Sequence, residues 1–189
     1  MNKRTNEPTN KRTKIISGGQ TGVDRAALDV ALELGIPCGG WCPRGRLAED
    51  GVIDEKYPLK ETKERAYEVR TEWNVRDSDA TLIITRGKPT GGTGYTVAMT
   101  RKYNKPVLII DLAKTGIKKA STEVRSWIAR TGIEILNISG PRSLSGNSTC
   151  HREEAEGRRG DPVKSISYTR LLRRFAPRND RKCHFQTGS

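Results

Sequence analysis

Short apolar runs alternate with segments of helical periodicity through the middle of this 189-residue chain. The apolar runs are short and bounded by polar or turn-forming residues, so they are predicted strands at 14–17, 36–42, 80–85, 107–112 and 133–138. The segments between them are predicted helices at 21–34, 61–77, 93–103 and 123–130. Strands and helices in strict alternation predict an α/β fold with three layers and a mostly parallel sheet.

Two of the predicted helices carry specific expectations about their packing and their start. The helix 61–77 is expected to pack through an apolar face that consists of Ala66, Val69, Trp73 and Val75. The helix 123–130 is expected to begin after two capping residues, Ser121 and Thr122.

The continuous apolar runs at 80–85 and 107–112 are typical of strands that are covered on both faces of a parallel sheet. Between the second predicted strand and helix 61–77, residues 43–58 read as a long loop rich in Gly, Asp, Glu and Arg.

The apolar pattern is confined to residues 14–142, which are predicted to form one ligand-binding domain. Residues 1–13 are polar and charged and are predicted to be a disordered basic tail. Residues 143–189 are predicted to be a basic, poorly ordered tail that does not join the core, with one short amphipathic helix at 168–175.

The net charge of +13 lies mainly at the two ends of the chain. Residues 1–14 carry +4 and residues 141–189 carry +6, which leaves +3 for the part between them. Solvated ends explain this distribution, and we therefore expect no nucleic-acid partner beyond non-specific contacts of the tails. Binding of polyanions through the tails remains an alternative function.

The cysteine and histidine content indicates a reduced compartment and no metal site. No apolar run approaches the length of a membrane span, so we expect no membrane partner and a cytoplasmic protein. Cys38 and Cys42 are expected to be packing residues. The pairs Cys150-His151 and Cys183-His184 lack the spacing of a zinc finger, and the acidic residues in 49–55 read as a solvated loop.

The first of two glycine clusters, Gly18-Gly19-Gln20-Thr21-Gly22, follows the first predicted strand and opens the first helix. It lacks the Gly-Lys-Ser/Thr ending of a P-loop and is not a dinucleotide fingerprint. Two interpretations stay open: a tight turn that needs positive φ, or an anion site built from backbone N–H groups.

The second cluster, Gly91-Gly92-Thr93-Gly94, opens the helix after the strand 80–85. Its glycines leave N–H groups open and Thr93 adds a hydroxyl donor. Ligand binding is therefore favoured over a purely structural turn.

Charged and aromatic residues near these turns have two interpretations each. Asp24 is either a capping carboxylate in the first turn of its helix or, in an enzyme, the catalytic group. Arg25 indicates either an anionic ligand nearby or an ion pair with an acidic loop residue. Trp41 either stacks on a planar ligand or packs in the core, and Arg44 beside it could bind an anion.

Parallel sheets bind ligands at the carboxyl ends of their strands, and both glycine clusters fall at that edge. Asn137, Gly140 and Arg142 belong to a third loop, after the last predicted strand, and reach the same crevice. Nucleophilic catalysis has no support, because the two histidines lie in the C-terminal tail and no Ser-His-Asp or Cys-His set can form in the core.

These motifs resemble, in combination, the family named putative molybdenum carrier proteins, a circularly permuted branch of the SLOG superfamily that includes the lysine-decarboxylase-like (LOG) proteins. The resemblance covers residues 14–142 and rests on these matching segments: Ile-Ser-Gly-Gly-Gln-Thr-Gly-Val-Asp-Arg from residue 16, 39–46, 79–83, 91–94 and 136–142. It implies a Rossmann-like fold, a homo-oligomer, and a small anionic ligand that is molybdenum cofactor, molybdate or another nucleotide-like compound.

One departure from the LOG pattern bears on activity. LOG enzymes carry Pro-Gly-Gly-x-Gly-Thr-x-x-Glu, and alignment on the glycines places Ala98 where that catalytic Glu stands. Since alanine cannot act as an acid or base, we expect a protein that holds its ligand and is not an enzyme. The alternative is a nucleotide hydrolase or phosphoribohydrolase that uses Asp24 or Glu49.

Overall fold

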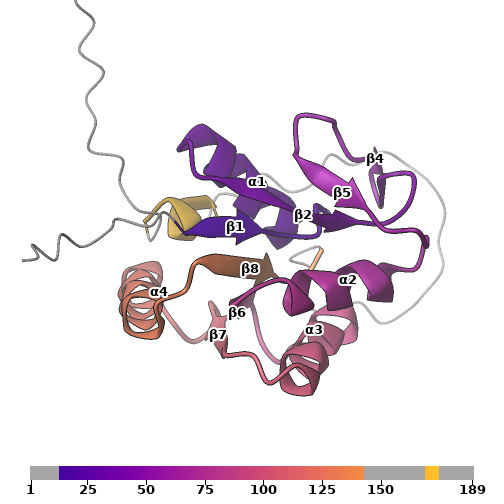
Figure 1. Cartoon of the computed structure of the whole chain (residues 1–189). Coiled ribbons are helices and arrows are strands. Elements are labelled where there is room, and N and C mark those ends of the chain that lie inside the picture. The colour runs from indigo at the N-terminus through magenta and orange to yellow at the C-terminus, as the bar shows by residue number, and fades with distance from the viewer. Residues whose placement is uncertain (1–12, 143–168, 175–189) are drawn as a thin grey trace, which may run out of the picture.

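The computed structural model describes residues 13–142 and 169–174, and its centre is a parallel sheet flanked by helices (Figure 1). The strands of this sheet are ordered β5-β2-β1-β8-β6-β7. Their bounds are β1 Lys14–Ile16, β2 Cys38–Cys42, β5 Leu59–Glu61, β6 Ala80–Thr85, β7 Val107–Asp111 and β8 Ile135–Ser139. The helices are α1 Val23–Glu33, α2 Tyr67–Arg76, α3 Gly91–Lys102 and α4 Ile117–Thr131. The prediction of a Rossmann-like α/β sandwich is confirmed.

One face of the sheet is apolar and packs against α1 and α4. Alternate residues of the central strands point to this side, so the strands and both helices share one core. That core includes Ile15 of β1, Leu82 and Ile84 of β6, and Leu136 and Ile138 of β8. Each of these five side chains is at most 5% exposed, so this face supplies the main hydrophobic stabilisation of the domain.

The opposite face carries buried polar side chains and packs against α2 and α3. In β8, Asn137 and Ser139 alternate with the apolar residues, and the Asn137 amide donates to the Thr81 hydroxyl of β6 at 3.3 Å. Helix α2 buries polar groups as well, notably Arg70 and Asn74. The sheet therefore has one apolar face and one face that carries buried polar side chains.

This polarity explains why the prediction for the packing face of α2 was wrong. Ala66 lies before the helix and is exposed, Val69 and Trp73 are only partly buried, and Val75 alone of the four is fully buried. The buried side chains of α2 are mostly polar because they have hydrogen-bond partners there: Asn74 bonds to the Trp41 backbone of β2 and Arg70 to Asp24 of α1.

Several boundaries also differ from the predictions. A short strand β5 precedes α2, which begins at Tyr67 and not at residue 61. Helix α4 begins at Ile117 after Gly116, because Ala120 and Ser121 are buried and extend the packing face toward the N-terminus. Within the predicted loop 43–58, β3 (Leu47–Ala48) and β4 (Gly51–Val52) pair as an antiparallel hairpin.

The sequence predicted that strand β7 is covered on both faces, and this prediction is wrong. Strand β7 is the edge strand next to β6, and Val107 and Ile109 are 36% and 40% exposed. The other face of β7 packs against the core, since Ile110 is 1% exposed and Leu108 contacts the same apolar cluster. An apolar stretch of sequence indicates hydrophobicity, but it does not show whether helices cover both faces of an edge strand.

The C-terminal residues 169–174 are helical and join the core, contrary to the expectation that this segment stands apart (Figure 1, yellow). Leu171 and Leu172 are 0% and 1% exposed and belong to the apolar cluster shared by α1 and α4. Arg173 forms an ion pair with Glu33 of α1, and Arg125 of α4 donates to the Arg174 carbonyl. The rest of the predicted tail, like residues 1–12, lies outside the described residues.

Cys38 and Cys42 pack beside a second, smaller apolar cluster, in agreement with the prediction. Among the described residues, no helix has both the length and the apolar character needed to cross a bilayer.

Candidate functional site

A cavity of about 370 Å³ opens at the carboxyl ends of the central strands. Three loops contribute to its walls: the turn after β1, the turn before and into α3, and the segment after β8. Helix α2 closes it from the side. The lining residues are Gln20, Asp24, Arg70, Thr90, Gly92, Thr93, Thr96, Ser139, Gly140, Pro141 and Arg142. The volume falls within the range of small-molecule sites, about 300–1,000 Å³.

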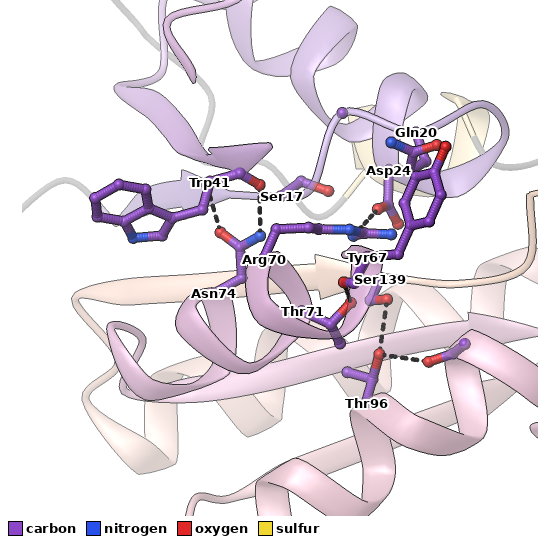
Figure 2. Close-up of polar contacts among 12 residues, drawn as sticks. Ser17, Gln20, Asp24, Trp41, Tyr67, Arg70, Thr71, Asn74, Thr96 and Ser139 are labelled. Carbon is purple, nitrogen blue, oxygen red and sulfur yellow. Dashed lines mark hydrogen bonds and ion pairs between the residues drawn. The ribbon is translucent and has the colours of Figure 1, made fainter. Parts of the chain in front are cut away.

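A buried ion pair lies at the inner end of this cavity. The Arg70 guanidinium donates through Nη1 to Asp24 Oδ2 at 3.1 Å, and both side chains are at most 10% exposed (Figure 2). Burial raises the pKa of the Asp24 carboxyl above its usual 3.8, while Arg70 and, more weakly, the Gly140 amide and Arg142 act in the opposite direction. Asp24 thus lines the cavity as a buried carboxyl group that is paired with Arg70.

The first glycine turn is filled by protein. A Cβ on Gly18 would lie 1.8 Å from Arg70 Nη1, and one on Gly22 would lie 2.4 Å from the Arg142 carbonyl oxygen. Gly22 also has a φ of +85°, which side chains rarely adopt. These glycines have a structural reason to be there, although Gly18, Gly19 and Gly22 as ligand contacts stay a prediction. Gln20, between them, lines the cavity.

The second glycine turn is open. Gly91 and Gly92 begin α3, and a Cβ on either would meet no atom within 4 Å. No side-chain cap hydrogen bond is made by Thr90, and the first turn of α3 contains no acidic residue. Free N–H groups and the positive end of the helix dipole therefore face the cavity beside Thr93. Gly94 lies one step further along the helix, near the Pro89 carbonyl.

Arg142 supplies positive charge at the mouth of the cavity. Its guanidinium lies over the ring of Tyr67, 4.6 Å from the centroid, and donates through Nη1 to Glu49 Oε1 at 3.0 Å. The Thr21 hydroxyl donates to the other Glu49 oxygen at 3.1 Å. Glu49, which lies in the β3–β4 hairpin, thus occupies a hydrogen-bonding position that an anion could take.

Three predicted site residues lie elsewhere. Arg25 pairs through both terminal nitrogens with Asp50 and donates through Nε to the Gly19 carbonyl, so the ion-pair interpretation holds for it. Trp41 points away from Gln20, Asp24 and Ser139 of the cavity wall (Figure 2), and its indole N–H donates to Asp77 at 2.7 Å. Arg44 is exposed and is not among the lining residues.

Asn137 and Gly140 lie where the sequence placed them, at and after the end of β8. Gly140 lines the cavity, and a Cβ there would lie 2.4 Å from the Ile84 carbonyl oxygen. Asn137 lines a smaller polar space behind the cavity, together with Thr71 and Asn74 of α2. Among the described residues, no group of His, Cys, Asp or Glu is arranged to hold a metal ion, and Cys150, Cys183 and both histidines lie outside them.

Residues 15–156 match the model of the circularly permutated YpsA SLOG family. The chain belongs to this family. Among solved structures, it is similar to the crystal structure of a putative molybdenum carrier protein from Syntrophus aciditrophicus. The TM-score is 0.77 at 44% sequence identity, and the match covers 88% of this chain and 96% of that one. No curated protein matches the chain.

Membership of the SLOG family does not by itself locate the acidic group of the site. Ala98, the residue that the sequence analysis aligned with the LOG glutamate, is exposed on α3 and is not among the residues that line the cavity. The carboxylate that borders the cavity is Asp24, from the first glycine turn.

The sequence analysis did not identify the lining residues Arg70 and Thr96. Thr96 donates to the Gly92 carbonyl at 3.0 Å and approaches the Ser139 hydroxyl at 3.4 Å (Figure 2). Arg70 and Asn74 are four residues apart on one side of α2, a polar stripe that could have been noticed in the sequence. The sequence alone does not favour a buried role for Arg70, because an arginine on a helix is usually solvated.

Proposed function

We propose that this protein binds a small phosphorylated or oxyanionic ligand, and that it carries this ligand without transforming it. The single observation that supports this most is the open start of α3 beside Arg142 at the mouth of the cavity. A helix N-terminus with free N–H groups and an adjacent guanidinium favour a negatively charged group. The other glycine turn then acts chiefly to shape the wall of the cavity.

Molybdenum cofactor and molybdate are the named candidates for the cargo, because the similar crystal structure is that of a putative molybdenum carrier protein. The lining residues contain no cysteine or histidine that could bind the metal directly. Such a cargo would be held through its phosphate or oxyanion oxygens by Gly92, Thr93 and Arg142. Native mass spectrometry of freshly purified protein tests this, and a ligand without an anionic group would contradict it.

Gly92→Asp is expected to weaken binding of inorganic phosphate and GMP at least about tenfold, because it places a negative charge at the start of α3. The matched control is Gly92→Ala, whose Cβ meets no atom within 4 Å and should leave folding intact and binding within a few-fold. Isothermal titration calorimetry measures both. Equal affinities in Gly92→Asp and wild type would rule out an anion site at this helix.

Glu49→Gln is expected to strengthen binding of inorganic phosphate several-fold, since Glu49 competes with an incoming anion for Arg142. Asp50→Asn is the matched control in the same hairpin. Asp50 pairs with Arg25, which is not among the lining residues, so its loss should leave phosphate binding unchanged. Calorimetry at low ionic strength gives the clearest reading. Weaker binding in Glu49→Gln would mean that Glu49 supports the site.

A second candidate function rests on Asp24, a buried carboxylate at the cavity whose raised pKa suits a general acid. In this alternative, the protein hydrolyses the N-glycosidic bond of a nucleoside monophosphate. Incubation with AMP and GMP, followed by chromatography for free base, distinguishes the hydrolase from the carrier. Base release that Asp24→Asn abolishes would identify an enzyme, and intact nucleotides would support a carrier.

A further inference from the structure

Within residues 13–142 and 169–174, three buried polar atoms on residues of the cavity wall have no hydrogen-bond partner: Gln20 Oε1, Asp24 Oδ1 and Arg70 Nε. All three residues line the cavity, and their side chains come from two different parts of the chain (Figure 2). Buried polar groups in native proteins are nearly always paired, so three such atoms in one place require an explanation.

The orientation of the Gln20 amide is fixed by its other end. Nε2 donates to the Leu47 carbonyl at 2.8 Å, and a carbonyl can only accept. Oε1 must therefore be the atom that is left over. Since Gln20 is 1% exposed, this acceptor has no access to bulk water.

Asp24 and Arg70 each use one polar atom in their ion pair, and each has a second polar atom that is not bonded. Oδ2 accepts from Nη1, which leaves Oδ1 as a second acceptor and Nε as a donor. The two side chains belong to α1 and α2, so their positions are set by the packing of two helices and not by a flexible loop.

An unpaired buried polar group is unfavourable, and a ligand that supplies its partner removes that cost. We infer that the inner end of the cavity recognises the 2-amino-4-oxopyrimidine edge shared by guanine and pterins. This edge presents two adjacent N–H donors and one carbonyl acceptor, which complement the acceptors of Gln20 and Asp24 and the donor of Arg70. The inference rests on the proposed function, in which the anionic end of the same ligand lies at α3.

Adenine provides the contrast. Its ring nitrogen at the matching position is an acceptor that would face an acceptor, its 6-amino donor would face the Arg70 donor, and it has no 2-amino group. Hypoxanthine keeps the ring N–H but lacks the 2-amino group. The expected order of affinity is GMP tighter than IMP and IMP tighter than AMP, with about tenfold for each unmet hydrogen bond.

The experiment measures dissociation constants of the full-length protein for GMP, IMP, AMP, inorganic phosphate and pterin-6-carboxylate by calorimetry. Gln20→Met and Asp24→Asn should each reduce the GMP-to-AMP ratio about tenfold, because each removes or alters one acceptor for the base edge. Gln20→Met serves if Asp24→Asn does not fold. The control is Thr100→Val, which removes a buried hydroxyl that bonds within α3, away from the lining residues, and should keep the full ratio.

Tighter binding of pterin-6-carboxylate than of GMP would assign the edge to a pterin, and the reverse would assign it to a guanine nucleotide. Equal affinities for GMP and AMP, a ratio that both variants leave unchanged, or a crystal structure with ordered water alone on the three atoms would overturn this inference. If inorganic phosphate binds while the bases are not distinguished, only this inference fails. If no compound in the panel binds, the proposed function fails as well.

Discussion

Leu172→Ala is expected to lower the free energy of unfolding by about 2–5 kcal/mol, the usual cost of truncating a fully buried leucine. Leu172 is 1% exposed and packs in the cluster shared by α1, α4 and the sheet, although it lies more than 30 residues beyond β8 in the sequence. Residues 169–174 therefore act as part of the domain core. Urea unfolding followed by circular dichroism measures the change.

Arg173→Ala is the matched control for this substitution. Arg173 neighbours Leu172 in the same helical segment, but its ion pair with Glu33 joins side chains that are about half exposed. Such a pair contributes roughly 0–1 kcal/mol. If Leu172→Ala and Arg173→Ala had equally small effects, the segment would not be packed as described.

Arg70→Met is expected to lower the free energy of unfolding by about 3–5 kcal/mol at neutral pH, because it removes the hydrogen-bonded cation from the buried Asp24 carboxylate. The double variant Asp24→Leu with Arg70→Met should be more stable than Arg70→Met alone, since no isolated charge remains. Arg76→Met on the same helix is the control. Its pair with Asp77 is about 40% exposed, so its loss should matter little.

The pH dependence of this effect has a definite sign. The pKa of Asp24 is raised in the folded protein, and removal of Arg70 removes an interaction that lowers it. A carboxyl with a raised folded-state pKa favours the folded state when protonated, and this contribution is lost as the pH rises from 3.8 through the folded value. Arg70→Met should therefore be closer to wild type at pH 5 than at pH 8. Denaturant titrations at both values test this, and the opposite trend would contradict a buried, unpaired carboxylate.

The buried pair also connects stability with ligand recognition. Arg70 and Asp24 hold the inner wall of the cavity in place, while Gly92 and Arg142 border its mouth. Substitutions at the first two are expected to affect folding and base recognition together. Substitutions at Gly92 or Glu49 are expected to change anion affinity alone, so the two parts of the site can be studied separately.

The alternation of apolar runs and helical segments was enough to predict a Rossmann-like sheet, because buried parallel strands and amphipathic helices each require their own periodicity. The matching segments between residues 16 and 142, taken in combination, indicated the SLOG family, which the match over residues 15–156 confirms. The sequence also placed both glycine turns and the segment after β8 at one edge, since the carboxyl ends of parallel strands meet there.

Tertiary structure alone decided what each of these features does. Gly18 and Gly92 look equivalent in the sequence, yet one is packed against Arg70 and the other faces open space. Arg70 and Asp24 are 46 positions apart, and their pairing depends on how α2 lies across a polar sheet face. Leu172 packs in the core although it lies more than 30 residues beyond the end of β8. Local patterns record periodicity and turn chemistry, whereas contacts between distant segments follow from the packing of whole helices and sheets.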